Sequence, residues 1–414
     1  MKDVLAIASS LLLGMALLML GAGLQGTLIG VRATLEEFPT VVIGAVMACY
    51  YVGYLAGSLT APRLVQRVGH VRVFAALSSL ASASILLQGM FVNALSWGVL
   101  RAVSGLCFAG IYVVAESWLN DRADNRTRAR LLGVYMAVIY IGLGAGQFLL
   151  NVDDPRTNTL FVLIAVLISL AVIPMSLSAQ RAPELTVPQP VRLGDLFRLS
   201  PLGVIAVLFS GAASGTVFAL GPVYAAGAYA MSGVSAFMAF SIFIAVLAQL
   251  PLGRLSDRLD RRTVLSGISL VAALAAGASF LLAAAPGAAF FAAAVLSSGL
   301  SLTIYSLAVS HINDHLLPAQ MVDASGTLIL VNGAGAVIGP LLVAAAMQWS
   351  GSSAYFAALA IMHVVFAVYT LWRKQRREPV ADEEKKRFVA AQPQTTPAGQ
   401  LSTSTQATEP PARA

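Results

Sequence analysis

Charged residues are scarce in this chain of 414 residues, since Asp, Glu, Lys and Arg together make up only 11% of it. Soluble domains average roughly 25% charged residues, and a soluble protein with a 58% hydrophobic composition would expose large apolar patches. Cysteine is rarer still, and Cys49 and Cys107 both fall in apolar stretches. This pattern excludes a disulfide framework, and we interpret both cysteines as small buried residues. The composition therefore excludes an ordinary soluble domain.

Long apolar runs occupy most of the chain. Three of them contain no Asp, Glu, Lys or Arg: Leu199–Gly253, Thr263–Asn313 and Ala324–Trp372. One membrane-spanning helix needs about 20 apolar residues, because the hydrocarbon core is about 30 Å thick. Each run must therefore cross the membrane, turn and cross back. Only helices and closed barrels satisfy backbone polar groups in lipid, and continuous apolar runs favour helices. The sequence predicts an all-α integral membrane protein.

We expect twelve membrane-spanning helices in two groups of six. In the second half, breaks at residues 227–235, 283–289 and 347–353 divide the three uncharged runs into six helices. The expected spans of the first half are Val4–Val31, Thr40–Ala61, Val73–Phe91, Leu95–Leu119, Leu131–Asn151 and Thr159–Ala179. The first span exceeds the apolar core of a signal peptide, so we interpret it as uncleaved.

The polar segments between these spans divide the chain into four parts. Residues 1–180 form one predicted six-helix bundle and residues 201–373 form the other. Residues 181–200 are polar and contain prolines, which is typical of an interdomain linker. Residues 374–414 are rich in Glu, Lys, Gln, Thr, Pro and Ala, and we expect a disordered tail.

Arginine placement predicts the orientation in the membrane. Fourteen arginines lie in one set of loops, whereas the opposite set holds only Arg32 and Arg156. Because cytoplasmic loops carry the excess of Lys and Arg, both termini are expected in the cytoplasm, with the chain in the inner membrane. The same distribution accounts for the net charge of +7 without a nucleic-acid partner.

The two halves repeat each other. IYVVAESWLND (111–121) and IYSLAVSHIND (304–314) share six of eleven residues at a spacing of 193 positions. The same spacing aligns Gly142 and Gly146 with Gly335 and Gly339, glycines that permit close helix approach. A parallel repeat of this kind is associated with transporters whose site lies between the halves.

A loop motif carries a family resemblance. GRLSDRLDRRTVL (253–265) resembles the G-x-L-a-D-R-x-G-R-[RK] motif of the major facilitator superfamily, departing from it at Asp260. The matching residues are Gly253, Leu255, Asp257, Arg258, Arg261 and Arg262. The first-half copy is eroded but keeps Arg67, Gly69 and Arg72. The sequence around AESWLND and IYSLAVSHINDH is similar to that of the YcaD-like branch of this superfamily. The resemblance implies alternating access by two bundles, with helices 1, 4, 7 and 10 around a substrate cavity.

Five residues are candidates for the walls of that cavity. Arg101, Phe108 and Tyr112 share one face of the fourth span. Gln25 lies in the first span, and Tyr305 is the repeat partner of Tyr112 in the tenth. Two alternatives stay open. Arg101 is also explained by snorkelling to the outer interface, and Gln25 by a hydrogen bond between helices.

Glu116 is a carboxylate near the cytoplasmic end of the fourth span. The resemblance implies a cytoplasmic latch in which such an acid pairs with motif arginines. The residues predicted for this latch are Glu116, Arg67, Arg72, Asp257, Arg258, Arg261 and Arg262. Solvation of a helix end and proton carriage are the alternatives. His311, Asp314 and His315 lack further ligands in sequence reach, so no metal and no cofactor is expected.

These features predict a secondary active transporter that moves a small organic solute across the cytoplasmic membrane. No carboxylate lies near the middle of a span, so proton coupling through a central acid is not indicated, although a coupling proton stays open. A membrane receptor that retains the fold is the alternative. An enzyme is not expected, because paired carboxylates, HExxH and GxSxG are absent in suitable contexts. We expect a monomer.

Overall fold

The described part of the first half is helical apart from short connections. The computed structural model describes residues 2–122, 128–177, 191–285 and 287–376, together with Lys385, Lys386 and Phe388. The first-half helices are α1 (Lys2–Leu35), α2 (Thr40–Val68), α3 (His70–Met90), α4 (Ala94–Arg122), α5 (Arg128–Phe148), the short 3₁₀ turn η1 (Leu149–Asn151) and α6 (Thr159–Ser176).

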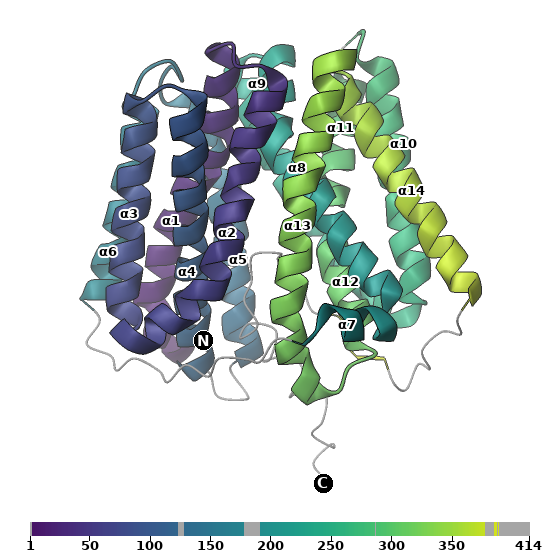
Figure 1. Cartoon of the computed structure of the whole chain (residues 1–414), viewed down its shortest axis with the longest axis horizontal. Coiled ribbons are helices and arrows are strands. Elements are labelled where there is room, and N and C mark those ends of the chain that lie inside the picture. The colour runs from purple at the N-terminus through teal and green to yellow at the C-terminus, as the bar shows by residue number, and fades with distance from the viewer. Residues whose placement is uncertain are drawn as a thin grey trace.

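The second half repeats this arrangement after a short additional helix. Its helices are α7 (Leu193–Leu199), α8 (Pro201–Ala228), α9 (Met231–Arg258), α10 (Arg261–Leu282), α11 (Ala288–Ser301), α12 (Ile304–Asn313), α13 (Pro318–Ser350) and α14 (Ala354–Arg376). Figure 1 shows the two halves side by side, with α7 at the lower end of the second.

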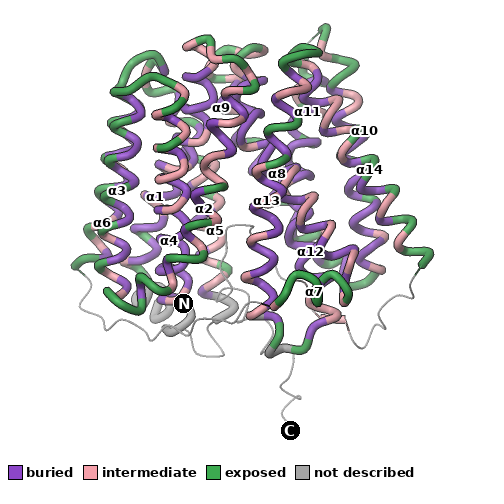
Figure 2. Tube along the Cα trace, viewed as in Figure 1, coloured by how far each residue is buried: buried purple, intermediate pink, exposed green. Residues whose placement is uncertain are grey.

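The predicted all-α fold with twelve spans is confirmed. Within the described residues, twelve segments are long and apolar enough to cross a membrane, and α11 with α12 make up one of them. The three expected breaks coincide with the ends of α8, α10 and α13. Large apolar side chains such as Leu274, Leu281 and Ile141 are exposed, as lipid contact allows. Exposed residues alternate with buried ones along most of the helices (Figure 2).

The tenth crossing contains an interruption that the sequence analysis did not predict. The helix stops at Ser301 and resumes at Ile304. The Ser301 hydroxyl donates to the Ser297 carbonyl at 2.8 Å, and Thr303 donates to the Leu300 carbonyl at 2.7 Å. Such side-chain bonds to preceding carbonyls compete with the helical ladder. The interruption coincides with these hydroxyl residues and contains no proline.

The halves meet along three helix pairs. In these pairs α2 packs on α13, α5 on α9, and α1 on α8. The Thr40 backbone N–H donates to Gln348 at 2.7 Å, and the Asn151 amide donates to Ser235 at 2.8 Å. Both bonds lie at the helix ends opposite the arginine-rich connections. Deeper along α5, Gln249 donates to the Tyr140 hydroxyl at 2.7 Å.

Glycines bring equivalent helices together in both halves. A Cβ on Gly146 would lie 2.3 Å from the Leu20 carbonyl of α1, and one on Gly142 would lie 2.6 Å from Met19. In the second half, a Cβ on Gly339 would lie 2.3 Å from the Ala212 carbonyl of α8. One on Gly335 would lie 2.0 Å from the Leu208 carbonyl. The same backbone contact is therefore built twice.

Two connecting segments are described only in part. Residues 181–190 of the predicted linker lie outside the described residues, and most of its remainder, Leu193–Leu199, forms α7. Most of the predicted tail, residues 374–414, lies outside the described residues. The exceptions contact the second bundle: the Lys386 N–H donates to Asp314 at 3.0 Å, and the Phe388 N–H donates to Asp257 at 2.8 Å.

Replacing Gly339 by alanine is expected to destabilise the protein, because its Cβ meets the fixed Ala212 carbonyl rather than a flexible side chain. The expected loss is about 1–3 kcal/mol, the range for overpacking. The measurement is the thermal unfolding temperature of the purified protein in detergent.

Gly326→Ala on the same helix is the matched control, because nothing lies within 4 Å of a Cβ there. It should unfold at or slightly above the wild-type temperature, since alanine favours a helix. Gly146→Ala and Gly133→Ala repeat the comparison on α5. Equal unfolding temperatures of Gly339→Ala and Gly326→Ala would contradict the close-packing argument.

Candidate functional site

A large cavity lies between the two halves and encloses about 1240 Å³ of empty space, including the part open to solvent. It is lined by Ala22, Gln25, Gly26, Met47, Tyr50, Tyr51, Tyr54, Arg101, Phe108, Tyr112, Tyr140, Leu143, Ser214, Phe218, Ala219, Ile242, Leu302, Ile329, Asn332 and Gly333. Most of this wall is apolar or aromatic, with a few polar groups, as in sites for small organic molecules.

Four of the five predicted cavity residues lie in this wall: Gln25, Arg101, Phe108 and Tyr112. The fifth, Tyr305, is buried on α12 and is not among the lining residues. It lies within electrostatic range of Tyr54, which does line the cavity. The structure therefore brings the helix 1 and helix 4 residues together and leaves Tyr305 behind the wall.

Arg101 is the cation of the cavity. Its side chain is 5% exposed, and its guanidinium carbon lies 4.6 Å from the centre of the Tyr50 ring. No described Asp or Glu forms an ion pair with it, and its Nε has no hydrogen-bond partner. Stacking on an aromatic face attracts a cation but does not neutralise it. The cavity wall therefore contains a buried positive charge without a carboxylate.

The close packing of α2 on α4 sets the position of this pair. A Cβ on Gly105 would lie 1.9 Å from the Tyr50 carbonyl, and one on Gly53 would lie 1.8 Å from the Ala102 carbonyl. Only glycine allows two backbones to approach this closely. The contact places Tyr50 directly beside the turn of α4 that carries Arg101.

Neutral polar groups complete the wall. Gln25 donates to the Ser104 hydroxyl at 3.3 Å, which joins α1 to α4. On the opposite side, the Asn332 amide donates to Ser210 at 2.9 Å, and Ser214 lies nearby in the wall. Gln25 thus makes the interhelical bond that was its alternative explanation and also lines the cavity.

The tyrosines of α2 were missed by the sequence analysis. Tyr50, Tyr51 and Tyr54 all line the cavity, as does Tyr140 of α5. The signal was present in the run YYVGY (50–54), three tyrosines within five residues of an apolar span. Asn332, an amide well inside an uncharged run, was a similar signal.

Glu116 lies deeper than its position near a helix end suggested. It is only 1% exposed and lies within electrostatic range of Tyr54, Tyr112 and Tyr135. Tyr54 and Tyr112 line the cavity, so the carboxylate stands directly behind its wall. Water does not surround this carboxylate.

The other residues predicted for a latch occupy two different surroundings. Arg67, Arg72, Asp257 and Arg258 lie exposed at the arginine-rich helix ends. Arg261 instead forms a buried ion pair with Asp314, 2.6 Å between Nε and Oδ2, and a longer one with Asp257 at 3.6 Å. The side chains of Arg122, Arg126, Arg128 and Arg130 lie outside the described residues.

Arg262 pairs with Asp260, the residue that caps the N-terminus of α10. Its guanidinium lies 2.8 Å from Asp260, which also accepts from the Arg262 backbone N–H at 2.9 Å. Burial raises the pKa of the Asp260 carboxyl, but the hydrogen bonds and charge of Arg262 outweigh it and leave that pKa below its ordinary value. In this structure Arg261 and Arg262 are therefore both paired with acids of their own bundle. Within the described residues, no group of side chains is arranged to hold a metal ion.

Comparison with known proteins decides the family. The sequence profile of the Major Facilitator Superfamily matches residues 11–322 and, in a second match, residues 234–406. The chain belongs to the major facilitator superfamily. It falls in the YcaD-like branch, as its motif wording indicated.

Curated relatives in this superfamily match nearly the whole chain. The uncharacterized MFS-type transporter YcaD of Escherichia fergusonii is 27% identical over 364 residues, covering 87% of this chain and 94% of the relative. YcaD of Escherichia coli O45:K1 is 27% identical over 368 residues, with the same coverage of 87% and 94%. The chain is therefore a multi-pass transporter of the inner membrane.

Solved structures of superfamily transporters share the fold. The nucleoside transporter NupG (D323A mutant) gives a TM-score of 0.75 at 13% identity, covering 89% of this chain and 100% of that one. A bacterial homologue of the human lysosomal transporter Spinster, inward-facing and occupied, gives 0.72 at 14% identity, covering 92% and 99%. At these identities the likeness concerns the fold alone.

Replacing Tyr50 by leucine is expected to destabilise the protein, because Arg101 loses the ring that faces its guanidinium. A desolvated cation–π contact contributes about 2 kcal/mol, so the thermal unfolding temperature should fall measurably. Tyr50→Phe keeps the ring and should stay near wild type.

Tyr51→Leu is the matched control, since Tyr51 also lines the cavity but does not lie over the guanidinium. If Tyr50→Leu and Tyr51→Leu unfold at the same temperature, the stacking contact contributes nothing specific.

Proposed function

We propose that this superfamily member is a secondary transporter for small organic anions with an apolar or aromatic body. The observation that carries the proposal is Arg101, a buried guanidinium in the cavity wall with no carboxylate partner among the described residues. Burying an unpaired charge is costly, and a bound anion would remove that cost. An unpaired guanidinium in the wall favours an anionic solute over a neutral one.

The remaining wall supports an amphiphilic substrate. Phe108, Phe218 and Ile242 present apolar surface, and the tyrosines of α2 add aromatic faces that end in hydroxyl groups. Gln25 and Asn332 place amides on opposite sides of the cavity. Such a wall suits a ring or short alkyl body with one charged group and one or two hydrogen-bonding groups.

Alternating access by the two bundles is the mechanism we propose. Hydrogen bonds join the halves at the ends opposite the arginine-rich connections, at Thr40 with Gln348 and at Asn151 with Ser235. If the arginine-rich ends face the cytoplasm, this arrangement corresponds to closure on the outer side. The ion pairs of Arg261 and Arg262 within their own bundle agree with an unlatched inner side.

Glu116 is the group we propose for coupling. A carboxylate that is 1% exposed beside the cavity tyrosines Tyr54 and Tyr112 resembles a proton-binding site more than a solvated helix end. Proton binding there would neutralise a charge behind the wall that contains Arg101. Substrate anion and proton would then be linked through one cavity.

Carboxylic acids are expected to stabilise the purified protein more than their methyl esters do, because only the acids bring a charge to Arg101. At about 100 times the dissociation constant a ligand stabilises the folded state by about 2.7 kcal/mol. Thermal-shift screening of matched acid and ester pairs measures this preference, and proteoliposome flux with the best acid tests transport.

Arg101→Gln should weaken binding of the acid by about tenfold or more, since a hydrogen bond to a charged group contributes about 1.5–3 kcal/mol. Arg72→Gln, at an exposed arginine, is the control and should bind normally. Equal binding of acids and esters would refute an anion site. Ligand binding without flux would favour a receptor.

Glu116→Gln is expected to abolish the dependence of flux on a pH gradient while leaving substrate exchange intact, because the amide cannot carry a proton. The measurement is uptake into proteoliposomes with and without the gradient. Glu36→Gln is the control, since Glu36 pairs with Arg32 outside the cavity. Retained gradient dependence in Glu116→Gln would exclude coupling through this residue.

The latch is tested in the same variant. A reporter cysteine at the arginine-rich ends, in a chain with Cys49 and Cys107 replaced by alanine, is labelled from that side. Changed labelling in Glu116→Gln would indicate that the carboxylate holds the ends together. Unchanged labelling would defeat the latch.

A further inference from the structure

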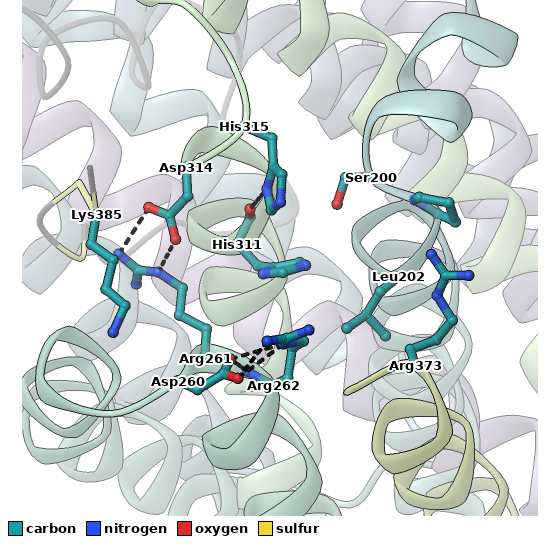
Figure 3. Close-up of a pocket in the computed structure, with 11 residues that line it drawn as sticks. Ser200, Leu202, Asp260, Arg261, Arg262, His311, Asp314, His315, Arg373 and Lys385 are labelled. Carbon is teal, nitrogen blue, oxygen red and sulfur yellow. Dashed lines mark hydrogen bonds and ion pairs between the residues drawn. The ribbon is translucent and has the colours of Figure 1, made fainter. Parts of the chain in front are cut away.

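A second pocket lies at one end of the second bundle, apart from the central cavity. It encloses about 460 Å³ of empty space, and Figure 3 shows its lining. The lining residues are Ser200, Pro201, Leu202, Asp260, Arg261, Arg262, His311, Asp314, His315, Arg373 and Lys385. They come from the start of α8 and α10 and from the ends of α12 and α14, together with one tail residue.

Positive charge is in excess in this pocket. Four lining side chains are cationic and two are acidic. Both acids are already bound, Asp260 by Arg262 at 2.8 Å and Asp314 by Arg261 at 2.6 Å. The guanidinium carbon of Arg373 lies 5.8 Å from the centre of the Trp372 ring, and no described acid pairs with Arg373. The side of the pocket that faces α14 therefore presents an unneutralised guanidinium.

Ser200 adds an independent observation. Serine is a favoured helix cap, yet Ser200 precedes α8 without capping it. Its side chain is 2% exposed, and its hydroxyl has no hydrogen-bond partner although it is buried. Figure 3 shows this hydroxyl, the Arg373 guanidinium and the His311 ring around the same space. A buried hydroxyl without a partner is unfavourable unless a ligand or water satisfies it.

The helix that starts at this pocket contributes a further positive potential. α8 extends over 28 residues, and its N-terminus carries a partial positive charge with unsatisfied N–H groups. Pro201 and Leu202 of this first turn line the pocket. At α10, by contrast, the Asp260 side chain already caps the helix. The uncapped helix start, the hydroxyl and the arginine all favour one ligand class, an oxyanion.

The pocket lies where the spans end. Ser200 directly precedes the span Pro201–Ala228, Asp260 directly precedes Arg261–Leu282, and Asp314 directly follows Ala288–Asn313. Trp372, which contacts Arg373, is of the residue type that marks the membrane–water boundary. This is the depth of lipid phosphates. Basic pockets at this depth are suited to anionic headgroups.

We propose that this pocket binds a phosphate group, supplied by the headgroup of an anionic membrane lipid. Ser200 donates its hydroxyl to a phosphate oxygen, and Arg373 provides the charge-assisted contact. The buried ion pairs of Arg261 and Arg262 fix the opposite wall. The site is independent of the central cavity, because none of its lining residues belongs to that wall.

The experiment uses the full chain in nanodiscs of phosphatidylcholine, with or without phosphatidylglycerol. Phosphatidylglycerol should raise the thermal unfolding temperature, and native mass spectrometry should show it retained. Arg373→Gln and Ser200→Ala should each weaken this binding by about tenfold or more, the effect of losing a charged hydrogen bond.

Arg376→Gln is the matched control. Arg376 also stacks on Trp372, at 5.6 Å, but does not line the pocket. It should respond to phosphatidylglycerol as the wild type does. An equal loss in Arg376→Gln and Arg373→Gln would show a general surface-charge effect and would overturn the proposal.

Inorganic phosphate added in detergent distinguishes the source of the phosphate group. Stabilisation by inorganic phosphate that Arg373→Gln abolishes, without retention of phosphatidylglycerol, would keep the oxyanion site but replace the lipid by a soluble ligand. If neither phosphatidylglycerol nor inorganic phosphate stabilises the wild type beyond Arg373→Gln, the pocket binds no phosphate group.

Discussion

Backbone contact between helices is the constraint on which this structure depends. At Gly146, Gly339 and Gly105, a Cβ would lie between 1.9 and 2.3 Å from a carbonyl oxygen of the neighbouring helix. In lipid no hydrophobic effect drives helices together, so dispersion contacts at such close approach must do it. The first two glycines hold α5 to α1 and α13 to α8, and the third fixes α2 on α4. The cavity lies between these pairs, so its shape follows from where glycine permits contact.

The duplicated plan has diverged at the ends of the spans. In the second half Arg261 and Asp314 form a buried ion pair at 2.6 Å. At the position equivalent to Arg261 the first half has His70, which bonds to Ser117 at 2.8 Å. A buried ion pair is hard to separate, because removing one partner leaves an uncompensated buried charge. The second bundle therefore has a buried ion pair at a position where the first has a histidine–serine hydrogen bond.

The sequence was sufficient to predict the fold, because comparing the length of each uncharged run with the thickness of the bilayer leaves few possible numbers of spans. The sequence was also sufficient to place Arg101, Phe108 and Tyr112 in the cavity wall, because a charge within a span marks one face of the helix. The sequence analysis missed Tyr50, which lines the cavity, and wrongly placed Tyr305 in its wall. Which face of α2 turns inward depends on contact with Gly105, and the position of Tyr305 depends on the interruption at Ser301–Ile304. Neither the contact between α2 and α4 nor the break before α12 can be predicted from the hydrophobic periodicity of a single span.

Arg261 and Arg101 are both buried, but they differ in whether the folded protein supplies a carboxylate partner. Arg261 is matched by a carboxylate, so the folded protein already satisfies it. Arg101 is also buried, but no described Asp or Glu pairs with it, and the Tyr50 ring offsets only part of the cost of removing a guanidinium from water. A fold optimised only for stability would replace Arg101 by an apolar residue or supply an acid. A charge kept at a net cost in a cavity wall is explained when the missing partner is the transported molecule itself.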